Sequence, residues 1–466
     1  MGIKEDTQDI IEGKKSFWFS ERIIFLGTLV SFFLFAVALL FTEAGNIHAP
    51  HKTFLDFFFD TVSVGTLTGL FRGDSGTFTF GGQFVLLLDM VINGLIASFI
   101  SILLIIFVRL GFDRKQTLRA EIENIGMHSK DILLFIFFDF IFIWTLGTLL
   151  LQFAGGRTWW ESIFNSASHI LNDGVTAFPN NMIPYNQHVW MLLSGAFLIT
   201  IGGLGISIRG YFYKIILKAV GLKKLAKSIP DSILAPKNFL IIILVTTAAL
   251  QIFGAVTIYG IEANNAKALP GVLDPAMKFL NAYYMSVSAR TAGFTTMPDL
   301  SLLHDKSNFI LMLLMSIGAS SGSFAGGILK LTAFIYLFIY VIARIRGDFE
   351  VETPHKHIHF SQRTVIEANF RVIGFTIILF VLLVALFFVQ PDISGMYLIF
   401  EAISGVSNTG LTLGATTLLN DWGMIIIIIL MTVGKLGFIT TVVSFFPKYQ
   451  HLIENAKTEF DEFPVD

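Results

Sequence analysis

Four short segments of the sequence end alike, in polar residues followed by a glycine and then an apolar residue. They are Phe57–Leu70, Ile163–Val175, Ala282–Phe294 and Phe400–Leu411. A serine stands six positions before the glycine in three of them, and Val287, between Ser286 and Ser288, takes that place in the third segment. Glycine tolerates a positive φ and lets a backbone carbonyl approach an axis without a Cβ in the way. Such loops suit a dehydrated cation, which needs oxygen ligands in place of its water shell.

The candidate ion-binding residues are each glycine and the residue before it: Thr68, Gly69, Asp173, Gly174, Ala292, Gly293, Thr409 and Gly410. Close helix packing in a membrane would explain one glycine after a short helix equally well, but four at equivalent positions favour a shared site. A short helix before each glycine would also direct its partially negative C-terminal end at the cation. Asp173 leaves two interpretations open, because its carboxylate could raise the local cation concentration or accept hydrogen bonds away from the site.

Two further features of the sequence, a glycine- and serine-rich stretch and a lysine within an apolar run, are unusual for a simple membrane-spanning helix. The stretch from Gly318 to Gly327 consists of small residues except for Phe324, which indicates a broken helix. Lys435 follows five consecutive isoleucines, at a depth where an ammonium group is costly. A small-residue packing seam and a lysine reaching the membrane interface are the alternatives. The candidate gating residues are Gly318, Ser320, Ser321, Gly322, Ser323, Gly326, Gly327 and Lys435.

The elements that must hold these residues are membrane helices. Apolar residues make up 54% of the 466 positions and charged residues 14%, against about 25% charged in ordinary soluble domains. Apolar runs such as Ile23–Phe41, Phe239–Tyr259 and Met424–Phe446 reach or approach the roughly 20 residues that cross a bilayer as a helix. These runs are continuously apolar, whereas the strands of a membrane β-barrel alternate apolar and polar residues. The fold class is therefore all-α, in contact with membrane lipid.

The four glycines are 105, 119 and 117 residues apart, which leaves room for two spanning helices and a loop in each interval. The repeating unit is an outer helix, a short half-helix, a glycine loop and an inner helix, and four parallel units can surround one central pore. The expected ranges are pore repeats at 22–110, 130–220, 235–343 (with the broken stretch) and 365–447, between termini at 1–21 and 448–466.

Charge placement predicts the orientation of these repeats. Lys and Arg gather in the connections between repeats, whereas Gln390–Asp421 contains neither. Short cytoplasmic loops are enriched in these residues. We expect the termini and these connections on the cytoplasmic side of the cell (inner) membrane, with the glycine segments opening outward.

The motifs resemble the Trk/Ktr/HKT superfamily of potassium-uptake proteins. SARTAGF at Ser288–Phe294 is similar to its third pore segment, and SNTGL at Ser407–Leu411 and TLTGL at Thr66–Leu70 are similar to its fourth and first. The second segment departs from the family's N-A-G-F, with Asp173 before the glycine and Val175 after it. In plant members a serine at the first glycine position accompanies sodium selectivity, so Gly69 favours potassium.

This resemblance implies a gated, potassium-selective pore with eight spanning helices. The stretch at Gly318–Gly327 would be the family's intramembrane gate loop, and Lys435 would replace a pore arginine. Gly202–Gly205 resembles the second inner helix and is assigned to packing behind the filter. The family further implies a Ktr-like homodimer with a cytoplasmic RCK-type nucleotide-binding subunit, potassium as the transported ion and no bound organic cofactor.

Other functions fit the sequence less well. No cysteine, nucleotide-binding loop or nucleophile–base pair is present in the sequence, so we expect no enzyme, and no nucleic-acid partner. A sodium-conducting or potassium–sodium symporting member remains the alternative. A transporter of a small organic solute would need a binding cavity near the middle of the membrane. Such cavities are usually formed by one pair of broken helices, whereas this sequence has four half-helices. His355, His357 and His359 allow a metal site, although a solvated loop is the preferred interpretation.

Overall fold

The computed structural model describes residues 25–46, 53–110, 117–229, 237–268, 271–320, 322–326 and 362–436, together with 351–353, 356–358 and isolated positions between 234 and 341. Only the backbone is described at 98–133 and 351–372. This part of the chain is helical apart from one antiparallel hairpin of β1 (Val351–Thr353) and β2 (Lys356–Ile358). His357 lies in β2, within a segment expected to be a loop, and His355 and His359 lie outside the described residues.

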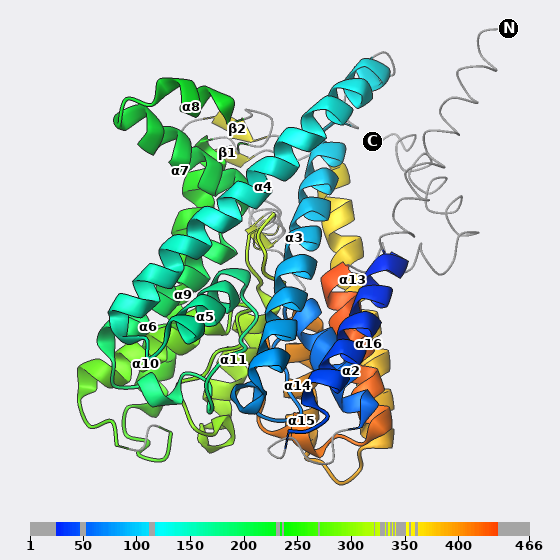
Figure 1. Ribbon diagram of the computed structural model, residues 1–466, viewed down its shortest axis with the longest axis vertical. Helices are drawn as coiled ribbons and strands as arrows, with labels where there is room; N and C mark the ends of the chain where they lie inside the picture. The colour runs from blue at the N-terminus through cyan, green and yellow to red at the C-terminus, as the bar shows by residue number, and fades with distance from the viewer. Residues whose placement is uncertain are drawn as a thin grey trace, which may run out of the picture.

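Four short helices, here called the half-helices, end at the four glycine segments. They are α2 (Phe54–Gly65), α5 (Trp159–Leu171), α10 (Pro275–Ser288) and α14 (Gly395–Ser407). Three of them begin at a side chain that caps the first backbone N–H groups: Thr53, Thr158 and Asp274. Such caps fix where a helix starts. Figure 1 shows the half-helices gathered in the lower half of the molecule.

Other helices precede and follow the half-helices. A helix at Phe25–Glu43, α4 (Thr117–Gly155), α9 (Lys237–Glu262) and α13 (Gln362–Val389) come before them. After them come α3 (Phe80–Leu110), α6 (Val189–Gly203), α11 (Asp305–Ser316) and α16 (Asp421–Leu436). In the described chain each half-helix thus stands between two other helices, of which α6 and α11, at 15 and 12 residues, are themselves short. Short elements fill the connections: α7 (Ile206–Ala219), α8 (Lys223–Ser228), α15 (Ala415–Leu418) and the 3₁₀ turns Ser75–Thr77, Ile183–Tyr185 and Leu300–Leu302.

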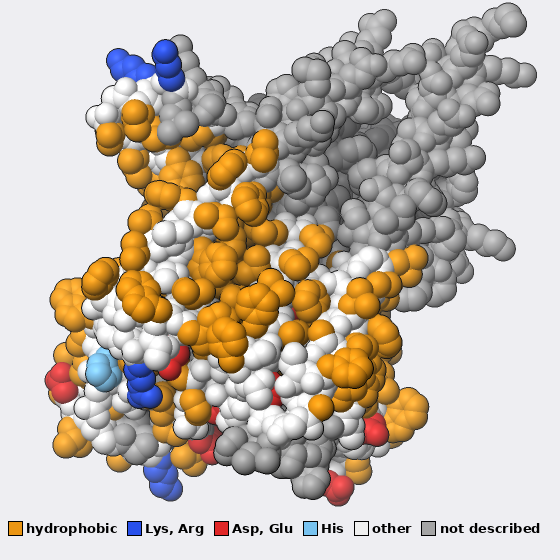
Figure 2. Space-filling view, in the orientation of Figure 1, with side chains coloured by type: hydrophobic (Ala, Val, Ile, Leu, Met, Phe, Trp, Pro, Cys, Tyr) orange, Lys and Arg blue, Asp and Glu red, His pale blue; other side chains and the backbone are white. Residues whose placement is uncertain are grey.

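Four helices in the described ranges are long and apolar enough to cross a bilayer: Phe25–Glu43, Phe80–Ala97, Leu134–Gly155 and Leu240–Glu262. Their outward faces carry exposed Phe, Leu, Ile and Val side chains. Figure 2 shows hydrophobic side chains over the middle of one face, with charged side chains towards its two ends. Lipid contact explains this surface, because water would penalise so large an apolar area.

The second inner helix is not continuous. It ends at Gly203 and restarts at Ile206 as α7, which turns by 107°. A Cβ on Gly202 would lie 1.9 Å from the carbonyl oxygen of Ile170, so α6 does pack tightly behind α5. The glycines assigned to packing therefore also mark a sharp break, and α7 and α8 continue towards the end of the molecule opposite the half-helices (Figure 1).

A buried ion pair holds this bend. Arg209 of α7 donates to Asp139 of α4 through Nε and Nη2, the latter at 2.8 Å, and both side chains are buried. Its Nη1 donates to the carbonyl oxygens of Ile201 and Leu204 at the end of α6. The carboxylate of Asp139 also accepts from the hydroxyl of Tyr213 at 2.7 Å. Arg209 thus satisfies carbonyl groups that the break in the helix leaves without intrahelical partners.

We expect Asp139→Asn to destabilise the protein by about 3–5 kcal/mol, because it leaves the buried guanidinium of Arg209 without its counter-charge. Thermal unfolding of the detergent-solubilised protein measures this loss. Asp392→Asn, at an exposed turn, is the control and should change stability by less than about 0.5 kcal/mol. Equal unfolding temperatures for Asp139→Asn and the unmodified protein would show that the ion pair does not hold the bend.

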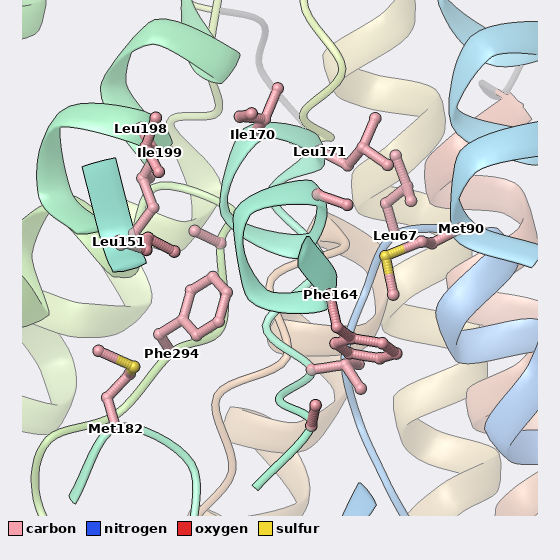
Figure 3. Packing of buried hydrophobic residues seen from close by; sticks show 14 of the residues in the cluster. Leu67, Met90, Leu151, Phe164, Ile170, Leu171, Met182, Leu198, Ile199 and Phe294 are labelled. Carbon is pink, nitrogen blue, oxygen red and sulfur yellow. The ribbon is translucent and has the colours of Figure 1, made fainter. Parts of the chain in front are cut away.

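The core behind the glycine segments is built from several of these helices at once. One buried cluster joins Leu67, Phe164, Leu171 and Phe294, which come from or directly follow three half-helices. Figure 3 shows these side chains packed together with Met90, Leu151 and Met182. Such packing holds the ends of the half-helices at fixed positions, because close-packed interiors leave little room for movement.

Candidate ion-binding site

The four glycine loops adopt one backbone conformation. Each glycine has a positive φ: +85° at Gly69, +81° at Gly174, +73° at Gly293 and +93° at Gly410. Two positions earlier, each loop has a second residue with positive φ: Leu67, Asn172, Thr291 and Asn408. Such a conformation is uncommon for residues other than glycine, so its recurrence at four equivalent positions shows that the four loops share a backbone pattern.

The serines identified in the sequence tie each loop to its half-helix. The carbonyl oxygens of Ser63, Ser168 and Ser404 accept from the backbone N–H of Thr68, Asp173 and Thr409, at 2.8–3.0 Å. In the third loop Ser288 takes this place, since its carbonyl accepts from Ala292 and Gly293. In the third segment, the accepting carbonyl therefore lies one residue later than in the other three, at Ser288 in place of Val287.

The four loops contact one another in a closed order. A Cβ on Gly69 would lie 2.0 Å from the carbonyl oxygen of Asp173, and one on Gly174 would lie 2.7 Å from that of Ala292. A Cβ on Gly293 would lie 2.3 Å from the oxygen of Thr409, and one on Gly410 would lie 2.0 Å from that of Thr68. We call these eight residues the glycine ring. All eight candidate ion-binding residues therefore meet, and each glycine leaves room for the carbonyl of the next loop.

Further contacts join neighbouring loops around the ring. Asn408 donates to the hydroxyl of Thr68 at 2.9 Å, which links the fourth loop to the first. Ser75 donates to the carbonyl oxygen of Thr176 at 3.0 Å, which links the first to the second. Asn181 donates to the carbonyl oxygen of Gly174 and accepts from the N–H of Thr295, which links the second to the third.

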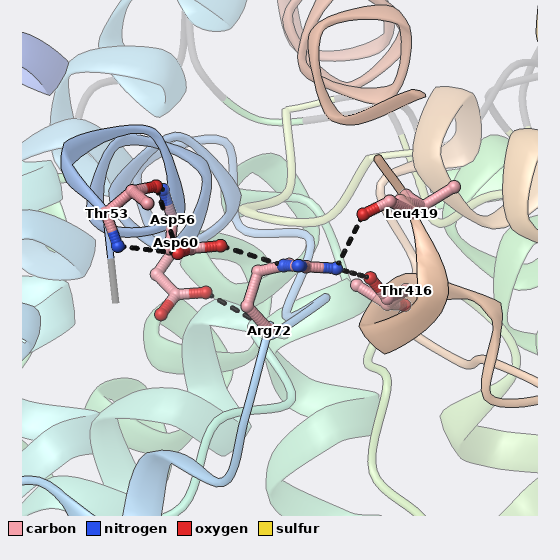
Figure 4. Close-up of polar contacts among 6 residues, drawn as sticks. All are labelled: Thr53, Asp56, Asp60, Arg72, Thr416 and Leu419. Carbon is pink, nitrogen blue, oxygen red and sulfur yellow. Dashed lines mark hydrogen bonds and ion pairs between the residues drawn. The ribbon is translucent and has the colours of Figure 1, made fainter. Parts of the chain in front are cut away.

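An arginine clamps the first and fourth segments together beside the ring. Arg72 pairs with Asp56 at 2.9 Å and donates to the carbonyl oxygens of Thr416 and Leu419, while its own N–H donates to Asp60. Figure 4 shows its guanidinium between the two segments. Arg72 thereby fixes the position of segments that are more than 340 residues apart in the sequence.

The broken stretch after α11 lies directly against the glycine loops. A Cβ on Gly326 would lie 2.6 Å from the Cβ of Asn408 and 2.7 Å from the carbonyl oxygen of Ser407. Gly318 accepts from Arg290, which belongs to the third loop, at 3.3 Å. Residues 317–326 are not helical where described, and Gly322 has a φ of +75°. We call residues 318–326 the intramembrane loop. It includes Gly318, Ser320, Gly322, Ser323 and Gly326, whereas Ser321 and Gly327 lie outside the described residues.

Lys435 of α16 reaches the intramembrane loop. Its Nζ donates to the carbonyl oxygen of Phe324 at 3.1 Å, and its side chain is half-buried. The ring of Phe324 lies 4.9 Å from the guanidinium carbon of Arg209 and packs edge-on against Phe140. Ser320 donates to the carbonyl of Gly203, and Ile206 donates to that of Gly322, at 3.1 Å each. The α6–α7 bend and Lys435 thus both hold the loop against the ring.

Asp173 belongs to the ring and is fully buried, and neither oxygen of its carboxylate has a hydrogen-bond partner among the described residues. The interpretation of Asp173 as a hydrogen-bond acceptor therefore finds no donor in this part of the chain.

Sequence reasoning missed several residues that surround the site. Arg72, Arg209 and Arg290 are charged side chains in or near apolar segments, and this feature alone could have marked them, because buried arginine is rare without partners. Their partners are distant in the sequence, as in the pair of Arg209 with Asp139, 70 residues away. The spacing patterns that identify repeats carry no information about such pairs.

The chain is similar to known cation transport proteins. The model of the TrkH family, described as a cation transport protein, matches residues 127–452. The "Ktr system potassium uptake protein B" of Bacillus subtilis is 28% identical over 406 residues, which cover 84% of this chain and 86% of that protein. The "Potassium/sodium uptake protein NtpJ" of Enterococcus hirae is 28% identical over 420 residues, 87% of this chain and 88% of that protein.

A solved structure shares the fold. The crystal structure of the potassium transporter TrkH from Vibrio parahaemolyticus superposes with a TM-score of 0.69 at 15% identity, and covers 91% of this chain and 85% of that one. The all-helical membrane architecture predicted from composition is confirmed at this level, apart from the β1–β2 hairpin.

Proposed function

The chain belongs to the TrkH family of cation transport proteins, and from that premise we propose that it is the pore subunit of a potassium-uptake system in the cell membrane. The names of the Bacillus Ktr proteins B and D, which match over 84% and 87% of this chain, support potassium as the transported ion. No organic cofactor is part of the proposal.

The closed glycine ring is the observation that carries this function. The carbonyl oxygens of Thr68, Asp173, Ala292 and Thr409 each stand against the glycine of a neighbouring loop. A potassium ion that enters must lose water, and carbonyl oxygens can replace that water at little cost when the protein already holds them in place. The C-terminal ends of the four half-helices add partial negative charge towards the same point. The ring is therefore proposed as the selectivity filter.

The proposed architecture is four parallel pore repeats around this filter, at 22–110, 130–220, 235–343 and 365–447. The shared backbone conformation of the four loops supports it. The intramembrane loop and Lys435 are proposed as the gate, because the loop contacts the fourth glycine loop at Gly326 while Lys435 bonds its backbone at Phe324. Ser321 and Gly327 belong to the proposed gate by sequence only.

The remaining parts of the proposal concern orientation and assembly. The excess of Lys and Arg in the connections between repeats supports cytoplasmic termini and a filter that opens outward. A homodimer and a separate cytoplasmic RCK-type regulatory subunit follow from the family resemblance. The word "system" in the names of the Ktr relatives is consistent with more than one component.

We expect expression of this chain to restore growth of a potassium-uptake-deficient bacterium at low external potassium. The growth assay is run with and without a co-expressed Ktr regulatory subunit, and the protein is quantified in the membrane fraction. An empty vector is the negative control, and high external potassium should rescue every strain. Protein present in the membrane without growth, in both settings, would contradict potassium uptake.

A further inference from the structure

Two buried polar side chains join the second and third half-helices. His169 of α5 and Tyr284 of α10 are each 0% exposed, and Nε2 of the imidazole lies 3.0 Å from the hydroxyl oxygen of the tyrosine. They are 115 residues apart in the sequence and belong to different repeats. His169 lies five residues before Gly174, and Tyr284 lies nine before Gly293. The contact therefore joins two pore repeats close to the glycine ring.

The hydrogen-bond partners assign the protons of this pair. Nδ1 of His169 lies 2.6 Å from the carbonyl oxygen of Asn165, which can only accept, so Nδ1 carries a hydrogen. In the neutral imidazole Nε2 then has a free lone pair. Tyr284 donates its O–H to Nε2, and the pair is satisfied without a net charge.

The same imidazole also supports the third loop. Its ring stacks on Phe294 at a centroid distance of 3.8 Å and an interplanar angle of 20°. Phe294 is fully buried and directly follows Gly293. Behind the pair, a Cβ on Gly195 would lie 2.9 Å from Nε2 and 3.0 Å from the tyrosine ring. The pair is thus held between α6 on one side and the third loop on the other.

We infer that His169 and Tyr284 form a brace that sets the spacing of the second and third filter loops, and thereby contributes to the choice of potassium over sodium. This inference rests on the proposed function. Sodium is smaller than potassium, so carbonyl oxygens must move inward to replace its water. Asp173 and Ala292 supply such oxygens from the two braced loops, and their collapse around sodium is harder when the half-helices behind them are linked. Both are positioning residues, since neither belongs to the glycine ring.

Tyr284→Phe removes only the hydroxyl oxygen and keeps the ring in place. In proteoliposomes we expect potassium flux to persist and the potassium-to-sodium flux ratio to fall by about three- to tenfold, as expected for one buried hydrogen bond. Tyr283→Phe is the matched control, because the neighbouring tyrosine is only partly buried and packs against the same cluster. Its ratio should stay at the value of the unmodified protein.

A second variant approaches the brace from the other side. Gly195→Ala places a methyl group against both side chains and should lower the same ratio, whereas Gly260→Ala, whose Cβ would meet nothing within 4 Å, should not. His169→Phe combined with Tyr284→Phe should lower the ratio no further than His169→Phe alone, because the loss of the imidazole already removes the hydrogen bond to the tyrosine.

The possible results distinguish a failure of the proposed brace from a failure of the proposed potassium-uptake function. An unmodified protein that carries no potassium would overturn the proposed function. Unchanged flux ratios in Tyr284→Phe and Gly195→Ala, with potassium flux intact, would overturn the brace alone. Additive effects in the double variant would also overturn it, since they would show that the two side chains act separately.

Discussion

Lys435→Ala is expected to raise potassium flux by up to about a hundredfold. The ammonium group bonds the intramembrane loop at the carbonyl of Phe324, and this loop lies against the fourth glycine loop. At an effective dielectric constant of about 20 and a separation of about 6 Å, it repels a potassium ion by roughly 3 kcal/mol, which corresponds to about a hundredfold in rate. Rubidium flux into proteoliposomes measures the effect. Selectivity should stay near that of the unmodified protein, because the ring is not altered.

Three companion variants test whether charge and loop act together. Lys435→Arg keeps the charge and should leave flux close to that of the unmodified protein. Deletion of Ser320–Ala325 should raise flux and weaken its dependence on a cytoplasmic regulatory subunit. Adding Lys435→Ala to the deletion should increase flux by less than it does alone, since the ammonium has lost its partner on the loop. A folded Lys435→Ala protein with unchanged or lower flux would instead indicate a lysine that reaches towards the membrane interface.

Gly69→Ser is expected to lower the potassium-to-sodium flux ratio about tenfold. The serine would have to adopt a φ of +85°, which costs about 1–2 kcal/mol, and its Cβ would lie 2.0 Å from the carbonyl oxygen of Asp173. The loops must move apart, so the carbonyl oxygens leave the positions that suit potassium. A difference of 1.4 kcal/mol between the two ions gives the tenfold change.

Gly293→Ser should behave in the same way, since its Cβ would lie 2.3 Å from the oxygen of Thr409. Gly27→Ser is the matched control, because a Cβ at this position in the first helix would meet nothing within 4 Å. Flux ratios of both ring variants equal to that of the Gly27 variant would exclude the ring as the filter.

The sequence predicted the loops well because their pattern is local and repeated. Gly69, Gly174, Gly293 and Gly410 share a period and a flanking pattern, and all four have the positive φ expected of them. The broken stretch after α11 was also predicted, since glycine and serine are poor helix formers in any context. These are properties of neighbouring residues, which one sequence reveals.

Features that depend on pairs of distant residues were not predicted. The order in which the loops contact one another, the bend held by Arg209 and Asp139, and the pair of His169 with Tyr284 all arise from packing between repeats. The role of Ser288 in the third loop was hidden by the one-residue shift in register. A periodic pattern fixes what each repeat contains, but the side chains that join unlike repeats follow no period.

Anomalous diffraction from crystals grown in rubidium tests the central claim most directly. Rubidium is similar to potassium in size and charge, and its position can be located independently of the protein. The proposed filter predicts an anomalous peak surrounded by the carbonyl oxygens of Thr68, Asp173, Ala292 and Thr409, which weakens in crystals of Gly69→Ser. A protein that transports rubidium but shows its peaks away from these four oxygens would contradict the assignment of the glycine ring as the filter.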